Sequence, residues 1–564
     1  MDYKKNIAQL IKIEGVTEEE IYGLLTFPKD LSMGDYCLPC FKFAGKLRKS
    51  PMAIADQLRD SIDLSENSYL EKVESVAGYL NFTLDKKDYA DKIIGKILEK
   101  GEEYGKSTVG QGKTVCIDYS SVNIAKPFHI GHLSTTVIGA ALYRIYKALG
   151  YEVVGINHLG DWGTQFGKLI SAYKRWGDKA DIEKRGIKAL FEIYVRFHQA
   201  EKDDPALADE GRAWFKKIED GDKEASELFA FFREVTLKEV EKLYERLGVK
   251  FDSYCGESFY NDKMQPVLDE LEEKGLLVES EGAKVVNLDE YDMPPCLLVK
   301  ADGATLYATR DMAAAFYRKQ TYDFDKCLYV VAYQQNLHFK QWFKVVELMG
   351  KEWSKDLIHV AFGMVSLEDG AMSTREGRVV FLEDVLNKAV EKAGDIINEK
   401  NPNLKDKEKI SEQVGVGAVV FSALCNNRIK DIVFNFDKVL NFDGETAPYL
   451  QYTVARCNSV IEKAGESKVL PDYSAVVGKV GNELTNMLSR FEQIVVDAGE
   501  KYEPSLVTRY LLGVAALYNK FYFEYKIISE DKAVQQARLN LTRATRTVLV
   551  NGLSLLGIEA PERM

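Results

Sequence analysis

Residues 120–136 read SSVNIAKPFHIGHLSTT, and this stretch decides the fold. The short apolar run before it, residues 115–119, is expected to be a strand. After it, apolar side chains recur at helical spacing over residues 132–149, and Gly150 marks the helix end. Residues 151–157 form a second apolar run, which we expect to be the next strand. A strand, a helix and a strand in this order predict a parallel α/β sheet.

The turn between the first strand and the helix carries two imidazoles, His129 and His132, on either side of Ile130 and Gly131. A helix N-terminus presents free N–H groups and a positive dipole end to an anion. Gly131 allows a ligand to approach the backbone closely, and Lys126 adds a positive charge. The turn is therefore a candidate phosphate site. The alternative is a pair of surface histidines that bind nothing.

The rest of the chain continues the alternation and then becomes helical. Residues 178–250 are dense in charge and have helical spacing, so we expect a helical insertion between two halves of the sheet. From Leu382 to the end, almost every segment has helical spacing. Between them we expect a strand, a helix, a strand, a helix and a strand, at residues 296–300, 310–318, 326–331, 337–349 and 357–362.

Length and charge restrict what this protein does. Its 564 residues suggest about three or four domains. The content of 46% hydrophobic and 29% charged residues excludes a mainly disordered or fibrous chain. A formal net charge of -12 excludes nucleic-acid binding by bulk charge. A polyanion would have to bind at local basic clusters, such as the one at Lys42, Lys46, Arg48 and Lys49.

Cysteine usage indicates a reducing compartment. Of eight cysteines, only Cys37 and Cys40 form a C-x-x-C pair, and no second pair completes a zinc site. We expect reduced cysteines in a cytoplasmic protein. The N-terminus lacks the apolar stretch of a signal peptide, and the longest apolar run, residues 414–425, is too short to cross a bilayer. No membrane partner is therefore expected.

Residues 100–114 are polar and rich in glycine, and they are expected to link two domains. They contain two Gly-Lys-Ser/Thr fragments that resemble part of a P-loop. A P-loop needs another glycine five positions earlier, where this chain has Lys100 and Ser107. We therefore exclude a P-loop here.

The tetrapeptide at residues 129–132 is identical to the HIGH signature of class I aminoacyl-tRNA synthetases. Further segments resemble the arginyl-tRNA synthetase family along the whole chain. They are DYSSVNIAKPFHIGHL (118–133), INHLGDWGTQFG (156–167), LYATRD (306–311), TAPYLQYTVAR (446–456) and APERM (560–564).

The resemblance implies three domains, with boundaries that we place from the sequence. Residues 1–106 would be an N-terminal α/β accessory domain that contacts tRNA. Residues 107–435 would be a Rossmann-type parallel-sheet catalytic domain that holds the helical insertion near residues 178–250. Residues 436–564 would be an all-α anticodon-binding bundle.

The resemblance also implies an ATP-dependent arginine–tRNA ligase. Such an enzyme activates L-arginine with ATP, releases pyrophosphate and transfers arginine to the 3′-terminal adenosine of tRNA(Arg). Mg²⁺ is expected to arrive with ATP, held by phosphates and water, so we expect no protein-bound metal. We also expect the protein to be a monomer.

The ATP site implied by the resemblance departs from the class I pattern in one loop. Residues 370–377 read GAMSTREG where the class has KMSKS, so Ala371 and Thr374 replace the two lysines. Arg375 or Lys126 would then supply the missing cation to the phosphates, although Lys126 could also be an ordinary surface lysine. The family pattern assigns to ATP the residues His129, Gly131, His132, Met372, Ser373 and Arg375.

Arginine selection requires an acid that pairs with the planar guanidinium fork. In LYATRD, Tyr307 and Asp311 are four residues apart, and thus on one face of a helix start. Glu257 is a weaker candidate for a second acid. Without the resemblance, Asp311 would be an ordinary acid of a first helical turn and Tyr307 a core residue. The family pattern assigns to arginine the residues Ser121, Asn123, His132, Tyr307, Asp311 and Gln335.

For tRNA, the resemblance points to both ends of the chain. Asn81 in GYLNF matches a segment of the accessory domain that meets tRNA. Tyr449, Arg456 and Met564 match the anticodon-binding part. The C-terminal helices also carry aromatic residues at helical spacing, which form either a core or a surface on which bases stack.

Two alternatives stay open at this point. One is another HIGH-type enzyme, either a nucleotidyltransferase or a cysteinyl-tRNA synthetase. Such enzymes lack the LYATRD segment, and the cysteinyl type needs a zinc site that this sequence does not provide. The other is a catalytically inactive paralogue that acts as an RNA-binding module, which the altered loop at residues 370–377 would favour.

Overall fold

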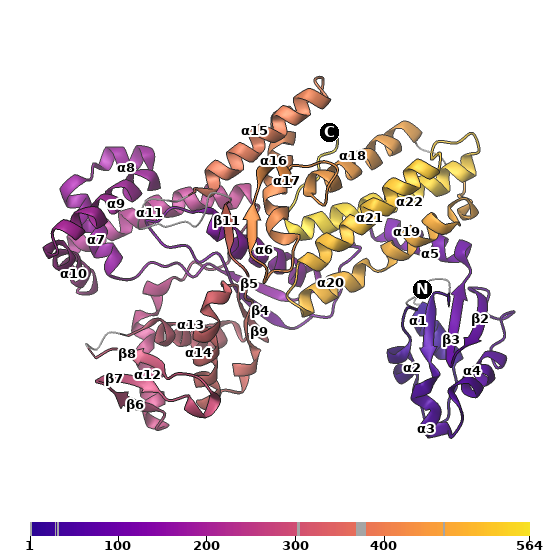
Figure 1. The fold of residues 1–564 in the computed structure, drawn as a ribbon, viewed down its shortest axis with the longest axis horizontal. Helices are drawn as coiled ribbons and strands as arrows, with labels where there is room; N and C mark the ends of the chain where they lie inside the picture. The colour runs from indigo at the N-terminus through magenta and orange to yellow at the C-terminus, as the bar shows by residue number, and fades with distance from the viewer. Residues whose placement is uncertain (1–2, 29, 31–32, 302–304, 368–379, 466–467) are drawn as a thin grey trace. The chain divides into compact units, whose positions relative to one another are not determined.

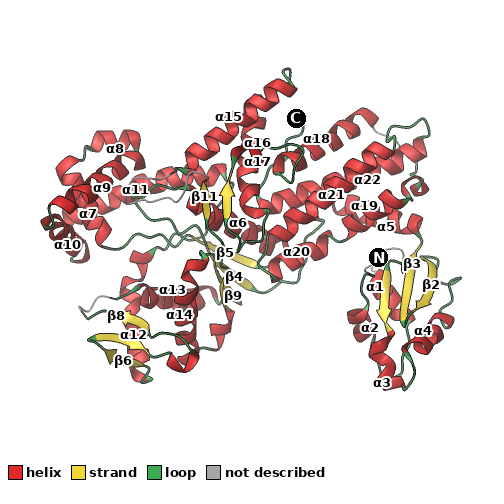
Figure 2. Cartoon of the chain, in the orientation of Figure 1, coloured by secondary structure: helices red, strands yellow, loops and turns green. Residues whose placement is uncertain are grey.

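The computed structural model describes residues 3–28, 30, 33–301, 305–367, 380–465 and 468–564. Helices make up most of this chain, as Figure 2 shows. The chain divides into two compact units. The first unit comprises Met1–Tyr104, Cys457–Arg490 and Val514–Val548, and the second comprises Gly105–Arg456, Phe491–Gly513 and Leu549–Met564.

The N-terminal part of the first unit is an antiparallel sheet in the order β1-β3-β2, packed with helices. The edge strand β2 and the central strand β3 are joined by a hairpin in which Ala77 and Gly78 both have positive φ, as a type I′ turn requires. Leu80, Phe82 and Leu84 of the middle strand are buried and form the core. The elements are α1 (Tyr3–Leu10), α2 (Glu18–Leu24), β1 (Tyr36–Pro39), α3 (Ala44–Leu47), α4 (Pro51–Asp60), β2 (Leu70–Val76), β3 (Tyr79–Leu84) and α5 (Lys86–Lys100).

The second unit is built on a parallel sheet in the order β10-β9-β4-β5. Its strands are β4 (Thr114–Asp118), β5 (Glu152–Ile156), β9 (Lys326–Tyr329) and β10 (Leu357–His359). Val115, Cys116 and Ile117 of β4 are wholly buried, as expected of a strand covered on both faces. The helix α6 (Leu133–Ala148) connects β4 to β5 and lies against both strands (Figure 1). The predicted βαβ unit is confirmed.

Helices follow β5 and separate it from the second half of the sheet. They are α7 (Thr164–Trp176), α8 (Lys179–Arg185), α9 (Ile187–Asp203), α10 (Ala206–Glu219) and α11 (Lys223–Arg246). The chain returns to the sheet through α13 (Tyr307–Tyr322), β9, α14 (Asn336–Leu348) and β10. A helix was expected over residues 310–318, and α13 extends beyond it at both ends.

One expected strand of the parallel sheet lies elsewhere. Residues 296–300 were placed in the strand–helix alternation. The strand β8 (Cys296–Val299) instead pairs antiparallel with β7 (Ala283–Val286), which pairs with β6 (Leu277–Ser280). These three strands form a separate sheet beside α12 (Met264–Glu273). A short apolar run does not reveal which strand it pairs with, so periodicity alone could not separate the two sheets.

The C-terminal part is helical, as expected, apart from β12 (Ile432–Phe434), which pairs in parallel with β11 (Val365–Leu367). Its helices are α15 (Leu382–Lys400), α16 (Lys407–Leu424), α17 (Phe436–Val439), α18 (Ala447–Ala464), α19 (Lys479–Ser489), α20 (Phe491–Glu500), α21 (Ser505–Glu524) and α22 (Lys532–Leu556). Within the described residues, no helix has both the length and the apolar content needed to span a bilayer.

Candidate active site

The two histidines of the predicted phosphate turn are neutral, and each uses Nδ1 to accept a backbone hydrogen bond, which leaves the N–H on Nε2. The N–H of Gly131 donates to Nδ1 of His129 (3.1 Å), and the N–H of His129 donates to Nδ1 of His132 (3.2 Å). Burial lowers the pKa of His129 to about 4, helped by the charge of Lys126, and lowers the pKa of His132 well below its usual value. Because each Nδ1 accepts a hydrogen bond from a backbone N–H, each neutral ring carries its proton on Nε2. Each ring can therefore donate one hydrogen bond to a ligand.

The loop before this turn has a conformation that side-chain-bearing residues rarely adopt. Positive φ angles occur at Ser120 (70°), Ser121 (47°) and Ala125 (61°). Two helices hold the loop in place. The N–H of Ser120 donates to Oγ1 of Thr135 on α6, and the N–H of Ala125 donates to Oγ1 of Thr236 on α11, both at 3.0 Å. The loop that carries the predicted head-group residues is thus fixed before any ligand binds.

Asn123 lies over the loop that follows β5. The N–H of Ile124 donates to the carbonyl of Gly160 (3.1 Å), and the N–H of Gly160 donates to the carbonyl of Val122 (2.9 Å). A Cβ on Gly160 would lie 2.2 Å from Oδ1 of Asn123, so any other residue would push the Asn123 side chain out of its place. The two loops after β4 and β5 are therefore joined beside the phosphate turn.

The described residues on either side of the segment that replaces KMSKS lie beside the same turn. On its N-terminal side, β11 lies against the turn at residues 130–132. On its C-terminal side, the N–H of Ile130 donates to the carbonyl of Val380 (3.1 Å), and the N–H of Leu382 donates to that of Phe128 (2.9 Å). The predicted ATP residues Met372, Ser373 and Arg375 lie outside the described residues.

Acidic side chains and His158 gather beyond the carboxyl ends of β4 and β5. Asp118 is the last residue of β4, and His158 and Asp161 follow β5. The charges of Asp118, Asp161 and Asp311 all act on the pKa of His158, and those of Asp161 and Asp311 act on Glu257. Two of these acids already have a cationic neighbour, since Arg318 pairs with Asp118 and Arg233 lies 3.6 Å from Asp161. The carboxyls of Asp311 and Glu257 are the ones that make this edge of the sheet a candidate site for a cationic ligand.

Within this acidic group, Asp118 is bound on both of its oxygens. Arg318 of α13 donates from Nη2 to Oδ2 (2.8 Å), and Ser121 donates from Oγ to Oδ1 (2.8 Å). Arg318 is 1% exposed, and its Nε and Nη1 have no hydrogen-bond partner among the described residues. This buried ion pair connects α13 to the strained loop that holds Ser121.

Asp161 and Glu257 have different surroundings. Asp161 accepts hydrogen bonds from the N–H and the hydroxyl of Ser258, both at 2.8 Å. Glu257 lies one residue earlier, at the start of the short helix Glu257–Lys263, and its N–H donates to the carbonyl of Leu159 (2.9 Å). Burial raises the pKa of Glu257 to about 7, although the charge of Arg310 opposes this rise. Near neutral pH Glu257 can therefore gain or lose its proton.

The predicted guanidinium residues lie at the starts of α13 and α14. Asp311 accepts a hydrogen bond of 2.6 Å from Nε2 of His338, which brings the two helices together. Tyr307 is the first residue of α13, one turn before Asp311, and its side chain is 66% exposed. Gln335 is also exposed and lies at the start of α14, three residues before His338. This exposure contradicts the alternative interpretation from the sequence, in which Tyr307 would be a core residue.

Family models match three consecutive parts of the chain. They are the arginyl tRNA synthetase N terminal domain at residues 1–84, the class I (R) tRNA synthetase catalytic domain at residues 93–436 and the DALR anticodon binding domain at residues 450–564. The chain belongs to the arginyl-tRNA synthetase family. The predicted fold class, an α/β catalytic domain with an N-terminal accessory domain and a helical C-terminal domain, is confirmed.

Full-length relatives agree with this family. An arginine–tRNA ligase of Alkaliphilus metalliredigens is 51% identical and one of Clostridioides difficile is 53% identical, and each match covers 100% of both chains. Among solved structures, arginyl-tRNA synthetase from Thermus thermophilus has a TM-score of 0.81 at 27% identity. That match covers 100% of this chain and 99% of the Thermus chain.

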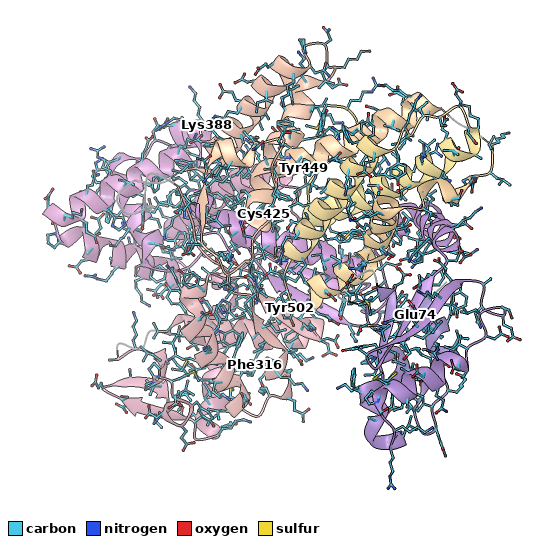
Figure 3. The ribbon with its side chains drawn as sticks, turned by 45° about the vertical axis from the view of Figure 1, so that its right-hand side comes forward. Glu74, Phe316, Lys388, Cys425, Tyr449 and Tyr502 are labelled. Carbon is cyan, nitrogen blue, oxygen red and sulfur yellow. The ribbon has the colours of Figure 1, made fainter. Side chains whose placement is uncertain are left out.

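The residues that the arginyl-tRNA synthetase pattern suggests for tRNA differ in exposure. Asn81 is 4% exposed in β3, and its Nδ2 has no partner among the described residues. Tyr449 (Figure 3) and Arg456 lie two turns apart on α18, and both are half-buried. The Arg456 guanidinium lies 5.0 Å from the ring centre of Tyr452. Met564 packs against the core between α15 and α16.

The aromatic residues of α21 belong to two environments. Tyr510, Tyr518 and Phe521 are buried, so that part of the pattern is core. Tyr522 and Phe523 are exposed, at 43% and 90%. Of these five side chains, the exposed pair is the one that an unpaired base can reach.

Among the residues the structure describes, no cluster of histidine, cysteine and acidic side chains could hold a metal ion. Cys37 and Cys40 are both buried as free thiols, and burial raises the pKa of Cys40 to about 11. A thiol with that pKa stays protonated near pH 7 and is a poor metal ligand.

Several residues of the site were not singled out from the sequence. Arg318 lies 200 residues from Asp118 and 160 from His158, and Asp311 is bonded to a histidine 27 residues away. No spacing rule relates residues so far apart. The one local signal for Arg318 was its position next to apolar residues of α13. Arginine is seldom buried without a partner, so an arginine on a buried helix face predicts an acidic partner elsewhere in the chain.

Proposed function

We propose that this protein activates L-arginine at the acidic group beside the His129–His132 turn and then transfers it to tRNA(Arg). Membership of the family and the full-length matches support the activity of an ATP-dependent arginine–tRNA ligase. The observation that carries the site is the group of carboxyls Asp161, Glu257 and Asp311 next to a turn with two neutral histidine donors. One half of this site suits a cation and the other suits phosphates.

In the arginine half, Asp311 would pair with the guanidinium fork, and Tyr307 and Gln335 would supply further polar contacts. Ser121, Asn123 and His132 would hold the amino and carboxylate groups. The strained loop supports this assignment, because it fixes Ser121 and Asn123 beside the acids.

In the ATP half, His129 and His132 would donate from Nε2, and Gly131 would leave room for a phosphate. Lys126 or Arg375 would supply the cation that the two replaced lysines no longer provide, and the family pattern adds Met372 and Ser373 to the residues that bind ATP. Mg²⁺ would enter with ATP, held by phosphates and water.

The chemistry requires positioning more than proton transfer. The arginine carboxylate is ionised at neutral pH, so it attacks the α-phosphorus directly and pyrophosphate leaves. Donors at the turn stabilise the charge that builds on the phosphates. The terminal 2′-hydroxyl of tRNA then attacks the carbonyl carbon of the adenylate and AMP leaves.

For the chain as a whole, we propose domains at residues 1–106, 107–435 and 436–564. Asn81 would lie in the tRNA-contacting surface of the first, and Tyr449, Arg456 and Met564 in that of the last. The protein would act as a cytoplasmic monomer, without a membrane partner.

ATP–pyrophosphate exchange tests the proposal. Exchange is expected with arginine but not with lysine, and only when tRNA(Arg) is added, because the family usually activates arginine on the tRNA complex. Rapid exchange without tRNA would show that the pocket is complete in the free enzyme. A protein that binds tRNA but neither exchanges nor aminoacylates would be an RNA-binding module instead.

A further inference from the structure

We propose that His338 is a positioning residue that fixes the plane of the Asp311 carboxylate and thereby favours a guanidinium over an ammonium substrate. This inference rests on the proposed function, in which Asp311 faces the arginine side chain. His338 itself makes no contact with the substrate in this scheme and acts through Asp311.

The contact is short and partly shielded from solvent. Nε2 of His338 lies 2.6 Å from Oδ2 of Asp311, and each side chain is 26% exposed. Among the residues the structure describes, His338 is the one hydrogen-bond partner of this carboxylate. Because a carboxylate only accepts here, Nε2 must carry the proton. Oδ1 and the second lone pair of Oδ2 are left for a ligand.

Both partners sit on anchored helices. Thr309, two residues before Asp311, donates from Oγ1 to the buried carbonyl of Leu298 (2.8 Å). Next to His338, Phe339 is buried, and its ring stacks on His359 at 4.2 Å. The hydrogen bond therefore joins two rigid elements and is not a surface contact that forms and breaks freely.

A carboxylate needs such a bond because its terminal torsion is soft. The rotation of an aspartate carboxylate has a broad, roughly two-fold preference, so the group alone does not define a plane. A donor on Oδ2 fixes that plane and also turns Oδ1 toward one side. A guanidinium fork gains from a fixed plane because its N–H groups are coplanar, whereas an ammonium is a point charge with rotating donors.

Two substitutions of His338 separate hydrogen bonding from packing. His338→Leu removes the donor, and His338→Gln keeps a donor nitrogen at a similar reach. In aminoacylation with tRNA(Arg), His338→Leu should raise the KM for arginine about tenfold, since a hydrogen bond to a charged group is lost. The KM for ATP and kcat at saturating arginine should change by less than about twofold. His338→Gln should recover most of the arginine KM.

The preference for arginine over lysine would not change if His338 only supported the structure, so this preference tests its positioning role. In pyrophosphate exchange with tRNA present, the preference for arginine over lysine should fall about tenfold in His338→Leu. The matched control is His359→Leu, which changes a histidine on the same aromatic cluster that does not touch Asp311. It should leave both the arginine KM and the preference unchanged.

The outcomes distinguish this inference from the proposed function. No arginine-dependent exchange in the unmodified protein would overturn the proposed function. If Asp311→Asn raises the arginine KM and His338→Leu does not, only the role of His338 is overturned. Equal effects of His338→Leu and His359→Leu on the arginine KM would show that His338 contributes only packing. The same conclusion would follow if His338→Gln did not recover the arginine KM. In the double variant with Asp311→Asn, the two effects should not add.

Discussion

Arg318 donates to Asp118 across 2.8 Å in the interior of the second unit, where their side chains are 1% and 8% exposed. Asp118 also accepts from Ser121 in the strained loop, so one carboxylate couples a buried cation to the segment beside the phosphate turn. The charge of Asp118 keeps the pKa of Arg318 well above its usual value against the opposing effect of burial. Arg318 therefore stays charged throughout the physiological range.

Asp118→Ala should destabilise the protein strongly, because it leaves the buried cation unpaired. The expected loss is about 3–5 kcal/mol, measured as a lowered denaturation midpoint of the unit. Removing the acid of the exposed Lys216–Asp220 pair with Asp220→Ala should leave the midpoint unchanged. The double replacement Asp118→Leu with Arg318→Met should recover part of the loss. Equal midpoints for Asp118→Ala and Asp220→Ala would contradict this account.

Lys126→Ala should slow arginine activation on the order of 100-fold, because one donor to the phosphates is lost. The rate is measured in a single turnover with tRNA(Arg) bound. Lys147→Ala, which removes an exposed lysine at the other end of α6, should have no effect. Near-normal activation by Lys126→Ala would leave Arg375 as the cation for that role.

Asp311→Asn should raise the KM for arginine about 30-fold or more, because a paired charge in a shielded site is removed. The KM for ATP should hardly move, since the phosphate turn lies on a different loop. Both constants are measured in aminoacylation. A similar loss for both substrates would indicate that Asp311 supports the structure of the site instead.

The arginine KM should depend on pH through Glu257. Its pKa is raised to about 7, so the carboxyl is mostly protonated below that pH and mostly ionised above it. The ionised form attracts a guanidinium, so the arginine KM should fall as pH rises from about 6 to about 8. Glu257→Gln should flatten this profile. His129 and His132 stay neutral over this range because burial lowers both pKa values.

The raised pKa of Glu257 also makes the stability of the protein depend on pH, and here the effect of rising pH is unfavourable. A glutamate whose pKa is raised in the folded state binds more protons than in the unfolded state between its usual pKa and about 7. Its contribution to stability is therefore present at low pH and is lost as pH rises toward 7. The unfolding midpoint of the unmodified protein should therefore include this loss as pH rises, and the midpoint of Glu257→Gln should not. A profile identical to that of the unmodified protein would show that Glu257 titrates normally.

Tyr449→Ala and Arg456→Ala should each weaken tRNA binding about tenfold, because each removes a platform or cation for an unpaired base. Arginine and ATP constants measured at saturating tRNA should stay the same. Tyr291→Ala, at an exposed tyrosine of the second unit outside α18, is the control. Loss of tRNA affinity in the control but not at Tyr449 would exclude the α18 surface.

The parts of the fold that the sequence predicted correctly are those whose information is local. The strand–helix–strand unit around His129 and His132 follows from hydrophobic periodicity and from a turn with glycine at its centre. The placement of Tyr307 and Asp311 on one helix face follows from their four-residue spacing. The strand Cys296–Val299 was assigned to the wrong sheet because pairing is decided by residues outside the run itself.

The sequence by itself thus determined the parallel sheet, the turn that carries His129 and His132, and the family. The tertiary structure decided how the charges of the site are balanced. Arg318 meets Asp118 across 200 residues, His338 meets Asp311 across 27, and Glu257 titrates near 7. The physical reason is that desolvation and charge–charge interaction depend on distance in space and on burial, and local patterning of a chain specifies neither.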